Sequence, residues 1–194
     1  MEACFERVVI PPSADQRVRM DGVRWADYEI FLAIRGESAI PRLSYLDGTL
    51  EIMSPSVDHE RVKKNLARLL ETWAFLTKFP IMGYGSWTLR SAPKARGLEP
   101  DECYVVGSVF RDPPDLAIEV VFSSGGIDKL DIYQGLGVRE VWTWEAGALT
   151  VRELGPNGYE VREKSALIPT IDLDKLARCA GIPNQLDALQ SFLA

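Results

Sequence analysis

The amino-acid sequence predicts a domain of the α/β or α+β class, in which helices flank a mixed β-sheet. Three observations carry this prediction: a hairpin pattern near the N-terminus, a long amphipathic helix after it, and a strand, helix, strand pattern in the second half. The chain has 194 residues, and 46% of them are hydrophobic, which is enough to bury a core within one domain. Since no repeat or long linker divides the chain, we expect residues 1–194 to form a single domain.

The first half of the chain contains the strongest local signals. Residues 25–34, WADYEIFLAI, predict a short amphipathic helix. In the run RLSYL-DG-TLEIM, residues 42–53, the Asp-Gly pair tolerates the positive φ of a two-residue turn, so two antiparallel strands are predicted. A helix is predicted after Ser-Pro-Ser, because apolar residues recur there at helical spacing: Val62, Leu66, Leu69, Trp73 and Leu76.

The second half predicts more strands, with one helix between two of them. After the Ser-Ser-Gly-Gly loop, residues 128–136 predict a helix that Gly137 ends, and the next strand completes a crossover unit. A Pro-Asn-Gly turn joins two further strands. The predicted strands cover residues 81–89, 102–106, 116–122, 140–144, 149–153 and 159–163, and the last helices lie near residues 173–179 and 185–193.

Cysteine usage and hydropathy predict an intracellular protein. The three cysteines, Cys4, Cys103 and Cys179, are odd in number and lack the spacing of a zinc site, so they predict neither a disulfide framework nor a structural metal. No apolar run reaches the roughly 18 to 20 residues of a membrane span, and the first residues, MEACFERVVIPP, lack the apolar core of a signal peptide. We therefore expect a cytoplasmic location and no membrane partner.

The net charge of −6 argues against a protein that binds nucleic acid through bulk charge. Basic residues are nevertheless concentrated between residues 61 and 96, where only Glu71 opposes them. They form either a basic stripe on an acidic body or an ordinary solvated helix face. These residues are Arg61, Lys63, Lys64, Arg68, Lys78, Arg90, Lys94 and Arg96.

A carboxylate inside the predicted strand 116–122 is the first candidate for chemistry. Glu119 shares a strand face with Ala117, because side chains alternate along a strand, and an unpaired buried charge there would be costly. Asp101 follows a proline at the mouth of the neighbouring predicted strand, so its carboxylate would meet that of Glu119 if the strands pair. A hard cation such as Mg²⁺ would neutralise the repulsion between the two groups.

Each of these acids also has a simpler explanation. Glu119 is alternatively an edge residue or the partner of an arginine, and the Pro-Asp pair at Asp101 alternatively begins a turn. Asp115 repeats the Pro-Asp pattern, but roughly four residues of strand, on the order of 13 Å, separate it from Glu119. We interpret Asp115 as the start of the strand and not as a metal ligand.

Five segments, in this order and spacing, resemble the Uma2 family, also called DUF820, of restriction-endonuclease-like proteins. They are DGTLEIMSPSVDHE, LEPDECYVV, PPDLAIEVVFSS, DKLDIY and GVREVWTWE. The resemblance covers about residues 20–165, so residues 166–194 would be C-terminal helices added to an endonuclease-like core. It implies the fold of the PD-(D/E)xK nucleases, in which a sheet flanked by helices carries an Asp on one strand and an (Asp/Glu)-x-Lys motif on the next.

The resemblance implies metal-assisted hydrolysis of a phosphodiester bond in DNA. Asp101 would be the aspartate of the PD element and Glu119 the acid of the next strand. Together with the main-chain carbonyl of Val120 they would hold Mg²⁺, or Mn²⁺. Val121 stands where the motif has its lysine, so Lys129 on the following helix would orient the attacking water or stabilise developing charge. Lys129 is alternatively a solvated surface residue.

Two further residues are auxiliary candidates. In the family's pattern a histidine at the place of His59 faces the acidic site, where it would bind phosphate, position water or extend the metal shell. His59 alternatively only helps to begin a helix. Glu51 is a candidate auxiliary acid, although pairing with Arg42 would explain it equally well.

The partners implied are DNA and a second copy of the chain. Nucleases of this size often work in pairs, so a homodimer is expected, and Trp142 and Trp144, which share one strand face, predict either core or dimer surface. Because Val121 replaces the motif lysine, the alternative function is a noncatalytic nucleic-acid- or protein-binding module on the nuclease scaffold. The phosphates of DNA would be contacted without regard to sequence by Arg61, Lys64, Arg68, Lys94 and Arg96.

Overall fold

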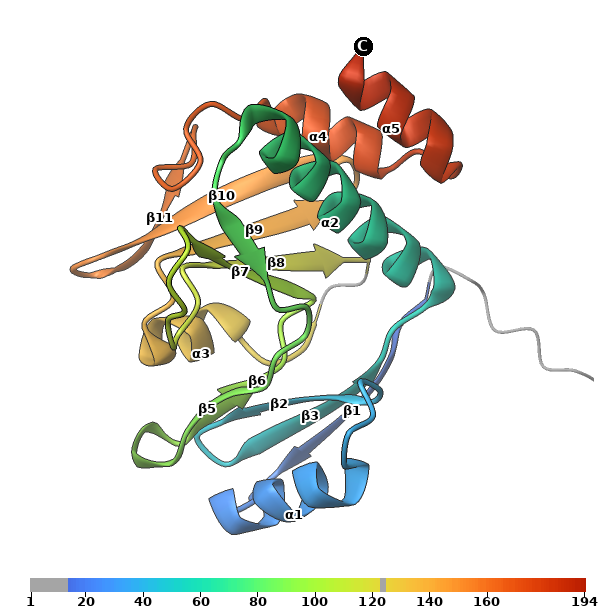
Figure 1. Ribbon diagram of the computed structural model, residues 1–194. Helices are drawn as coiled ribbons and strands as arrows, with labels where there is room; N and C mark the ends of the chain where they lie inside the picture. Colours follow the sequence, from blue (N-terminus) through green and yellow to red (C-terminus); the bar gives the residue numbers. More distant parts are fainter. Residues whose placement is uncertain (1–13, 123–124) are drawn as a thin grey trace, which may run out of the picture.

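The computed structural model describes residues 14–122 and 125–194. Within these residues the chain forms two β-sheets and five α-helices (Figure 1). The smaller sheet has five strands in the order β1-β3-β2-β6-β5, and the larger has six in the order β11-β10-β9-β8-β7-β4. The predicted mixed α+β class with flanking helices is confirmed, and the second sheet is an addition to the prediction.

The smaller sheet is antiparallel throughout and includes the predicted hairpin. Asp47 and Gly48 have φ values of 44° and 95° at the turn between β2 and β3, as the Asp-Gly pair predicts. Helix α1, Trp25–Arg35, packs Tyr28 and Leu32 against this sheet. The strands are β1 (Gln16–Asp21), β2 (Arg42–Leu46), β3 (Thr49–Ser54), β5 (Leu89–Ser91) and β6 (Arg96–Leu98).

The larger sheet contains one parallel pair, β8 and β9, joined through α3 (Lys129–Leu136), which confirms the predicted crossover. Gly137, with φ 87°, ends α3. Helix α3 lies between the two sheets, and α2, α4 and α5 cover the opposite face of the larger sheet (Figure 1). The remaining elements are β4 (Ile81–Gly83), α2 (Val57–Thr77), β7 (Glu102–Val106), β8 (Leu116–Val121), β9 (Glu140–Glu145), β10 (Ala148–Gly155), β11 (Gly158–Arg162), α4 (Leu173–Ala180) and α5 (Gln185–Leu193).

The side chains of β8 divide between the two faces of the larger sheet, as their alternation predicts. Leu116, Ile118 and Val120 belong to the core on the side of α2, whereas Ala117 packs on the side of α3. Because side chains two apart on a strand share a face, Glu119 also lies on the α3 side. This places Glu119 in the layer between the two sheets.

Three features of the structure differ from the sequence prediction. The predicted extended segment 81–89 is two strands, β4 and β5, in different sheets, because the chain turns around Gly85, whose φ is 59°. Leu76, predicted to face the core, is 57% exposed, because the buried residues of α2 end at Ala74. The short strands β1 and β6 were not predicted.

The interpretations that concern tryptophan, cysteine and membranes can also be compared with the structure. Trp142 and Trp144 are 0% and 5% exposed, so they are core residues. Cys103 and Cys179 are buried free thiols, whereas Cys4 and the segment examined for a signal peptide lie outside the described residues. In the part of the chain that the structure describes, no helix combines the length and apolarity needed to cross a membrane.

Candidate functional site

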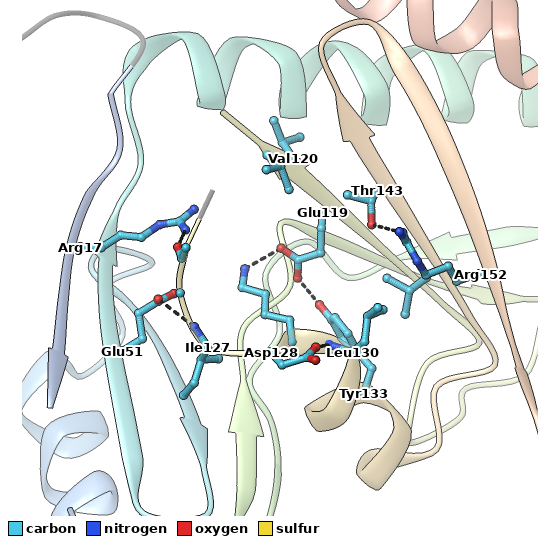
Figure 2. Close-up of a pocket in the computed structure, with 15 residues that line it drawn as sticks. Arg17, Glu51, Glu119, Val120, Ile127, Asp128, Leu130, Tyr133, Thr143 and Arg152 are labelled. Carbon is cyan, nitrogen blue, oxygen red and sulfur yellow. Dashed lines mark hydrogen bonds and ion pairs between the residues drawn. The ribbon is translucent and has the colours of Figure 1, made fainter. Parts of the chain in front are cut away.

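A pocket of about 310 Å³ lies beside β8, in the layer between the two sheets (Figure 2). Strands β1 and β3 of the smaller sheet line one side of it, and β8, α3, β9 and β10 line the other. We call it the Glu119 pocket. It brings together four of the residues predicted from the sequence, which are Glu51, Glu119, Val120 and Lys129.

Glu119 is 5% exposed and receives one donor on each carboxylate oxygen. Lys129 Nζ donates to Oε2 at 2.6 Å, and the hydroxyl of Tyr133 donates to Oε1. The two donors come from the same face of α3, because residues four apart on a helix are neighbours. Burial and the charge of Glu119 hold the pKa of Tyr133 well above its usual value, so its hydroxyl keeps the proton that it donates. These contacts explain how a strand interior tolerates Glu119.

Asp101 is fully buried and does not line the Glu119 pocket. The pairing of β7 with β8 ends at Glu102 and Ile118, and Asp101 is the residue just before β7. Its Oδ2 accepts a hydrogen bond from the main-chain N–H of Val120 at 2.6 Å. The carboxylate of Asp101 therefore reaches the main chain of the residue next to Glu119.

The other oxygen of Asp101 contacts a buried histidine and a buried arginine. His59 Nε2 lies 2.9 Å from Asp101 Oδ1, and the guanidinium of Arg42 pairs with the same oxygen. Ser56 caps the start of α2 and places His59 in the first helical turn. His59 thus lies in the first turn of the helix and faces Asp101, whereas its role toward phosphate, water or a metal stays a prediction.

The opposite nitrogen of His59 meets Asp15, which was not predicted as a site residue. His59 Nδ1 lies 3.0 Å from Asp15 Oδ2. Burial lowers the pKa of His59, an effect that the Asp15 carboxylate opposes and the charge of Arg42 reinforces. Burial also opposes ionisation of Asp15, but the hydrogen bond from the Ser56 main chain and the proximity of His59 outweigh it and lower the pKa of Asp15.

Glu51 lines the pocket from β3 and is 3% exposed. Its Oε2 accepts a hydrogen bond from the Ile127 main chain at 3.2 Å. The suggested pairing of Glu51 with Arg42 is not formed, because Arg42 pairs with Asp101 and with Glu60 instead. Gly126 passes so close that a Cβ atom there would lie 2.6 Å from Glu51 Oε2, so only glycine fits at this point of the loop.

The five residues predicted to contact nucleic acid do not line the Glu119 pocket. Lys64 and Arg68 lie on the outer surface of α2, beside the exposed Phe75. The other three donate to main-chain carbonyls: Arg61 to Gly181 at 3.1 Å, Lys94 to Gly135 at 2.6 Å and Arg96 to Asp131 at 3.1 Å. The cationic side chains that do line the pocket are Arg17, Lys129 and Arg152.

Sequence reasoning missed Arg17, Tyr133 and Arg152 as pocket residues. Tyr133 had one available signal, since it lies one helical turn after Lys129 on the predicted helix. The alternation of side chains along a strand says which residues share a face with Arg152. It does not say that this face meets Glu119, because that depends on how β8, β9 and β10 pair. Arg17 belongs to a strand that was not predicted.

The carboxylates suit a hard cation in their chemistry, although they do not form a dense cluster. Within residues 14–122 and 125–194, no group of three or more His, Cys, Asp or Glu side chains is arranged to hold a metal ion. Each oxygen of Glu119 and Oδ2 of Asp101 accept one hydrogen bond from the protein, which leaves each a further lone pair. Mg²⁺ needs only one or two carboxylates, because water and carbonyl oxygens complete its shell. These oxygens are of the type that Mg²⁺ prefers.

Comparison of the sequence and of the fold with known proteins identifies the family of this chain. The sequence profile of the Uma2 family, described as "Putative restriction endonuclease", matches residues 25–181. No curated protein matches the chain. Among solved structures, a putative nuclease belonging to DUF820 from Anabaena variabilis ATCC 29413 is similar, with a TM-score of 0.52 and 14% sequence identity over 85% of this chain and 98% of that one. This likeness shows the restriction-endonuclease-like fold, and because the profile spans most of the sequence, the chain belongs to the Uma2 family.

Proposed function

We propose that the protein is a metal-dependent endonuclease that hydrolyses phosphodiester bonds of DNA at the Glu119 pocket. The observation that carries the proposal is the ion pair between Glu119 and Lys129 in a pocket whose wall residue Val120 donates its main-chain N–H to Asp101. Membership of the Uma2 family and the restriction-endonuclease-like fold support a nuclease. The dependence on Mg²⁺ rests on the chemistry of the carboxylates, and the choice of DNA rests on the description of the family as a restriction endonuclease.

Asp101 and the residues of the pocket have distinct roles in this proposal. Asp101, Glu119 and the main-chain carbonyl of Val120 would hold Mg²⁺, or Mn²⁺. When bound, the ion lowers the pKa of a water molecule and offsets negative charge on the phosphate. Lys129 orients the attacking water and stabilises charge that develops on the phosphate, because its ammonium group already lies in the pocket.

Two auxiliary residues support this arrangement. His59 fixes the orientation of Asp101 through its contact with Oδ1. Glu51 adds a second carboxylate to the pocket wall, opposite Glu119, and holds the loop that leads into α3 through Ile127. Val121 at the motif position does not leave the site without a lysine, since Lys129 reaches Glu119 from α3.

The proposal is tested by incubating plasmid and branched DNA with the protein and Mg²⁺ or Mn²⁺. We expect cleavage by the wild-type protein and its loss in Asp101→Asn and Glu119→Gln, because each variant removes a carboxylate charge that would hold the metal. Calorimetric titration should show weaker metal binding in both variants, with circular dichroism confirming that they fold. Glu145→Gln is the matched control, since the exposed Glu145 is paired in register with Val121 on the neighbouring strand but lies outside the pocket.

A noncatalytic nucleic-acid- or protein-binding module is the second candidate. Two observations favour it: Val121 occupies the motif position, and Arg42 and His59 already engage one oxygen of the buried Asp101. Wild-type protein that neither binds the metal nor cleaves DNA would select this candidate over the enzyme.

We also propose that the protein acts as a homodimer, because cutting both strands of DNA is served by two copies of one site. Size-exclusion chromatography with light scattering tests this proposal, and a monomeric mass at the concentrations used for cleavage would contradict it.

A further inference from the structure

Arg152 is a cationic side chain in the Glu119 pocket that has no acidic partner among the described residues. It is half-buried, and its guanidinium donates to Thr143 Oγ1 at 3.2 Å. The other cations of the pocket are each near an acid, Lys129 with Glu119 at 2.6 Å and Arg17 with Asp15 at 3.6 Å. Among the cations of the pocket, Arg152 is therefore the one without a direct ion pair in the described part of the chain.

Strand register places Arg152 two strands away from Glu119, on the same face of the larger sheet, with Thr143 on the strand between them. In the parallel pairing of β8 with β9, Glu119 is opposite Thr143, and in the antiparallel pairing of β9 with β10, Val141 is opposite Arg152. Val141 and Thr143 are two apart on one strand, so Glu119, Thr143 and Arg152 all lie on the α3 side of the sheet. Neighbouring strands are about 4.8 Å apart. Figure 2 shows Thr143 and Arg152 together, next to Glu119.

The free hydrogen-bonding capacity of the pair suits an anion. Thr143 Oγ1 accepts from Arg152, so the hydroxyl hydrogen of Thr143 can donate elsewhere. The guanidinium has five N–H donors in a planar fork, a geometry that matches two oxygens of a phosphate group. A carboxylate partner would have cancelled this charge, and within residues 14–122 and 125–194 no ion pair involves Arg152.

We propose that Arg152 and Thr143 bind an oxygen of a phosphodiester group in the DNA strand that enters the Glu119 pocket. The proposal rests on the proposed nuclease function for the identity of the strand. It assigns the pocket a phosphate subsite formed by the two strands next to β8, with Thr143 on the first and Arg152 on the second, on the side opposite Glu51 (Figure 2).

The test is equilibrium binding of a short fluorescein-labelled DNA duplex in EDTA, measured over a range of salt concentrations. Arg152→Ala should weaken binding by about tenfold to a hundredfold, the effect of losing a charge-assisted hydrogen bond. It should also reduce the slope of log Kobs against log[salt] by about 0.9, because one phosphate contact is lost. Thr143→Val should weaken binding while leaving the slope unchanged, since it removes a hydroxyl and no charge.

Two further variants distinguish a specific phosphate contact at Arg152 from a general effect of positive charge. Arg162→Ala is the matched control, because Arg162 lies on β11, the neighbour of β10, and pairs with Glu153 and Glu160 outside the pocket. Arg162→Ala removes one positive charge, as Arg152→Ala does. It should change the affinity for the duplex and the salt slope only by the small effect of a distant charge. Arg152→Lys should retain the slope but lose affinity, because an ammonium group lacks the planar fork.

The outcomes distinguish this inference from the proposed function. An unchanged slope in Arg152→Ala overturns the subsite even if the wild-type protein cleaves DNA, and so does an absence of duplex binding by the wild-type protein at low salt. A reduced slope in a protein that does not cleave supports the subsite and overturns the nuclease. If Arg152→Ala fails to fold, Arg152→Gln decides on the same readout, because glutamine can still donate to Thr143.

Discussion

At the scale of single residues, Glu119 shows how a strand interior accommodates a charge. An unpaired buried carboxylate would cost several kcal/mol, roughly what a buried charge without compensation demands. Lys129 and Tyr133 remove this cost by supplying one donor to each oxygen. The motifs of the sequence indicated Lys129, because the resemblance allows the lysine to move to the following helix. They did not indicate Tyr133, because its contact depends on how α3 packs against β8.

The hydroxyl of Tyr133 offers a direct test of this compensation. Tyr133→Phe should lower the free energy of unfolding by about 1.5 to 3 kcal/mol, because it removes a hydrogen bond to a charged, buried acceptor. Tyr159→Phe is the matched control, since the Tyr159 hydroxyl donates to the neutral carbonyl of Val138 at 2.6 Å, and should cost about 0.5 to 1.5 kcal/mol. Urea denaturation measures both values. An equal loss in the two variants would show that the charge of Glu119 adds nothing to the bond.

The raised pKa of Glu102 predicts that the stability of the protein depends on pH. Burial raises the pKa of Glu102, an effect that Lys63 opposes and Glu71 reinforces. Between the unfolded value of 4.5 and the higher folded value, the folded state binds more protons than the unfolded state, so stability falls as pH rises through this window. Above the window, the wild-type protein keeps an ionised carboxylate in a site that is only 8% exposed.

Glu102→Gln should therefore be more stable than the wild-type protein at pH 7. The advantage should shrink as pH falls and vanish below about 4.5, where both folded and unfolded Glu102 are protonated. Urea denaturation at a series of pH values measures the difference. A difference that stays constant with pH, or a less stable variant at pH 7, would contradict the assignment.

At the scale of elements, local patterns predicted most helices and strands but not their sheets. The Asp-Gly turn specified the hairpin of β2 and β3, and Ser56 with the apolar spacing specified α2, because these signals depend on neighbouring residues. Sheet membership depends on pairing between distant segments. For this reason segment 81–89 was predicted as one strand, although it contributes to both sheets, and β6, only three residues long, was missed.

Because the N-cap of α3 fixes the first turn of this helix, we expect it to affect the position of Lys129 in the pocket. Asp128 accepts hydrogen bonds from the main chains of Leu130 and Asp131, so it holds the first turn of the helix that carries Lys129 and Tyr133. Asp128→Ala should lower stability by about 1 kcal/mol, the usual cost of losing an N-cap. If the proposed function holds, cleavage should fall as well, because Lys129 loses its fixed position.

Asp172→Ala is the matched control for the cap. Asp172 is also an exposed N-cap and accepts from the Lys175 main chain at 2.8 Å, but its helix, α4, covers the far face of the larger sheet. It should lower stability by a similar amount, about 1 kcal/mol, while cleavage is unchanged. Thermal unfolding and plasmid cleavage of the two variants provide the comparison. If both variants cleave DNA equally well, the cap of α3 has no effect on catalysis.

At the scale of the whole molecule, the Glu119 pocket exists only where the two sheets meet. Arg17 and Glu51 come from the smaller sheet, while Glu119 and Arg152 come from the larger one. The order of the family motifs indicated the acids on neighbouring strands, since β7 and β8 follow each other along the chain. Arg17 and Arg152 are far apart in sequence, and no local pattern places them in the same pocket.

Helix α3 connects the two sheets, and a substitution of Gly135 tests whether these contacts contribute to stability. Lys94 and Arg96, from the smaller sheet and its preceding turn, donate to main-chain carbonyls of α3, and the side chain of Arg96 crosses over Gly135. A methyl group at position 135 would overlap with Arg96 Cδ and force that side chain away. Overpacking costs about 1 to 3 kcal/mol, and the better helix propensity of alanine returns up to about 1 kcal/mol.

Gly135→Ala should therefore lower the free energy of unfolding by about 1 to 2 kcal/mol, and it should reduce DNA cleavage if the pocket depends on both sheets. Gly181→Ala is the control, because a Cβ there meets its nearest atom at an ordinary 3.4 Å and the backbone is already helical, with φ −71°. Urea denaturation should show a lower midpoint only for the variant at position 135. If both variants unfold at the wild-type midpoint, Arg96 does not hold the smaller sheet against α3.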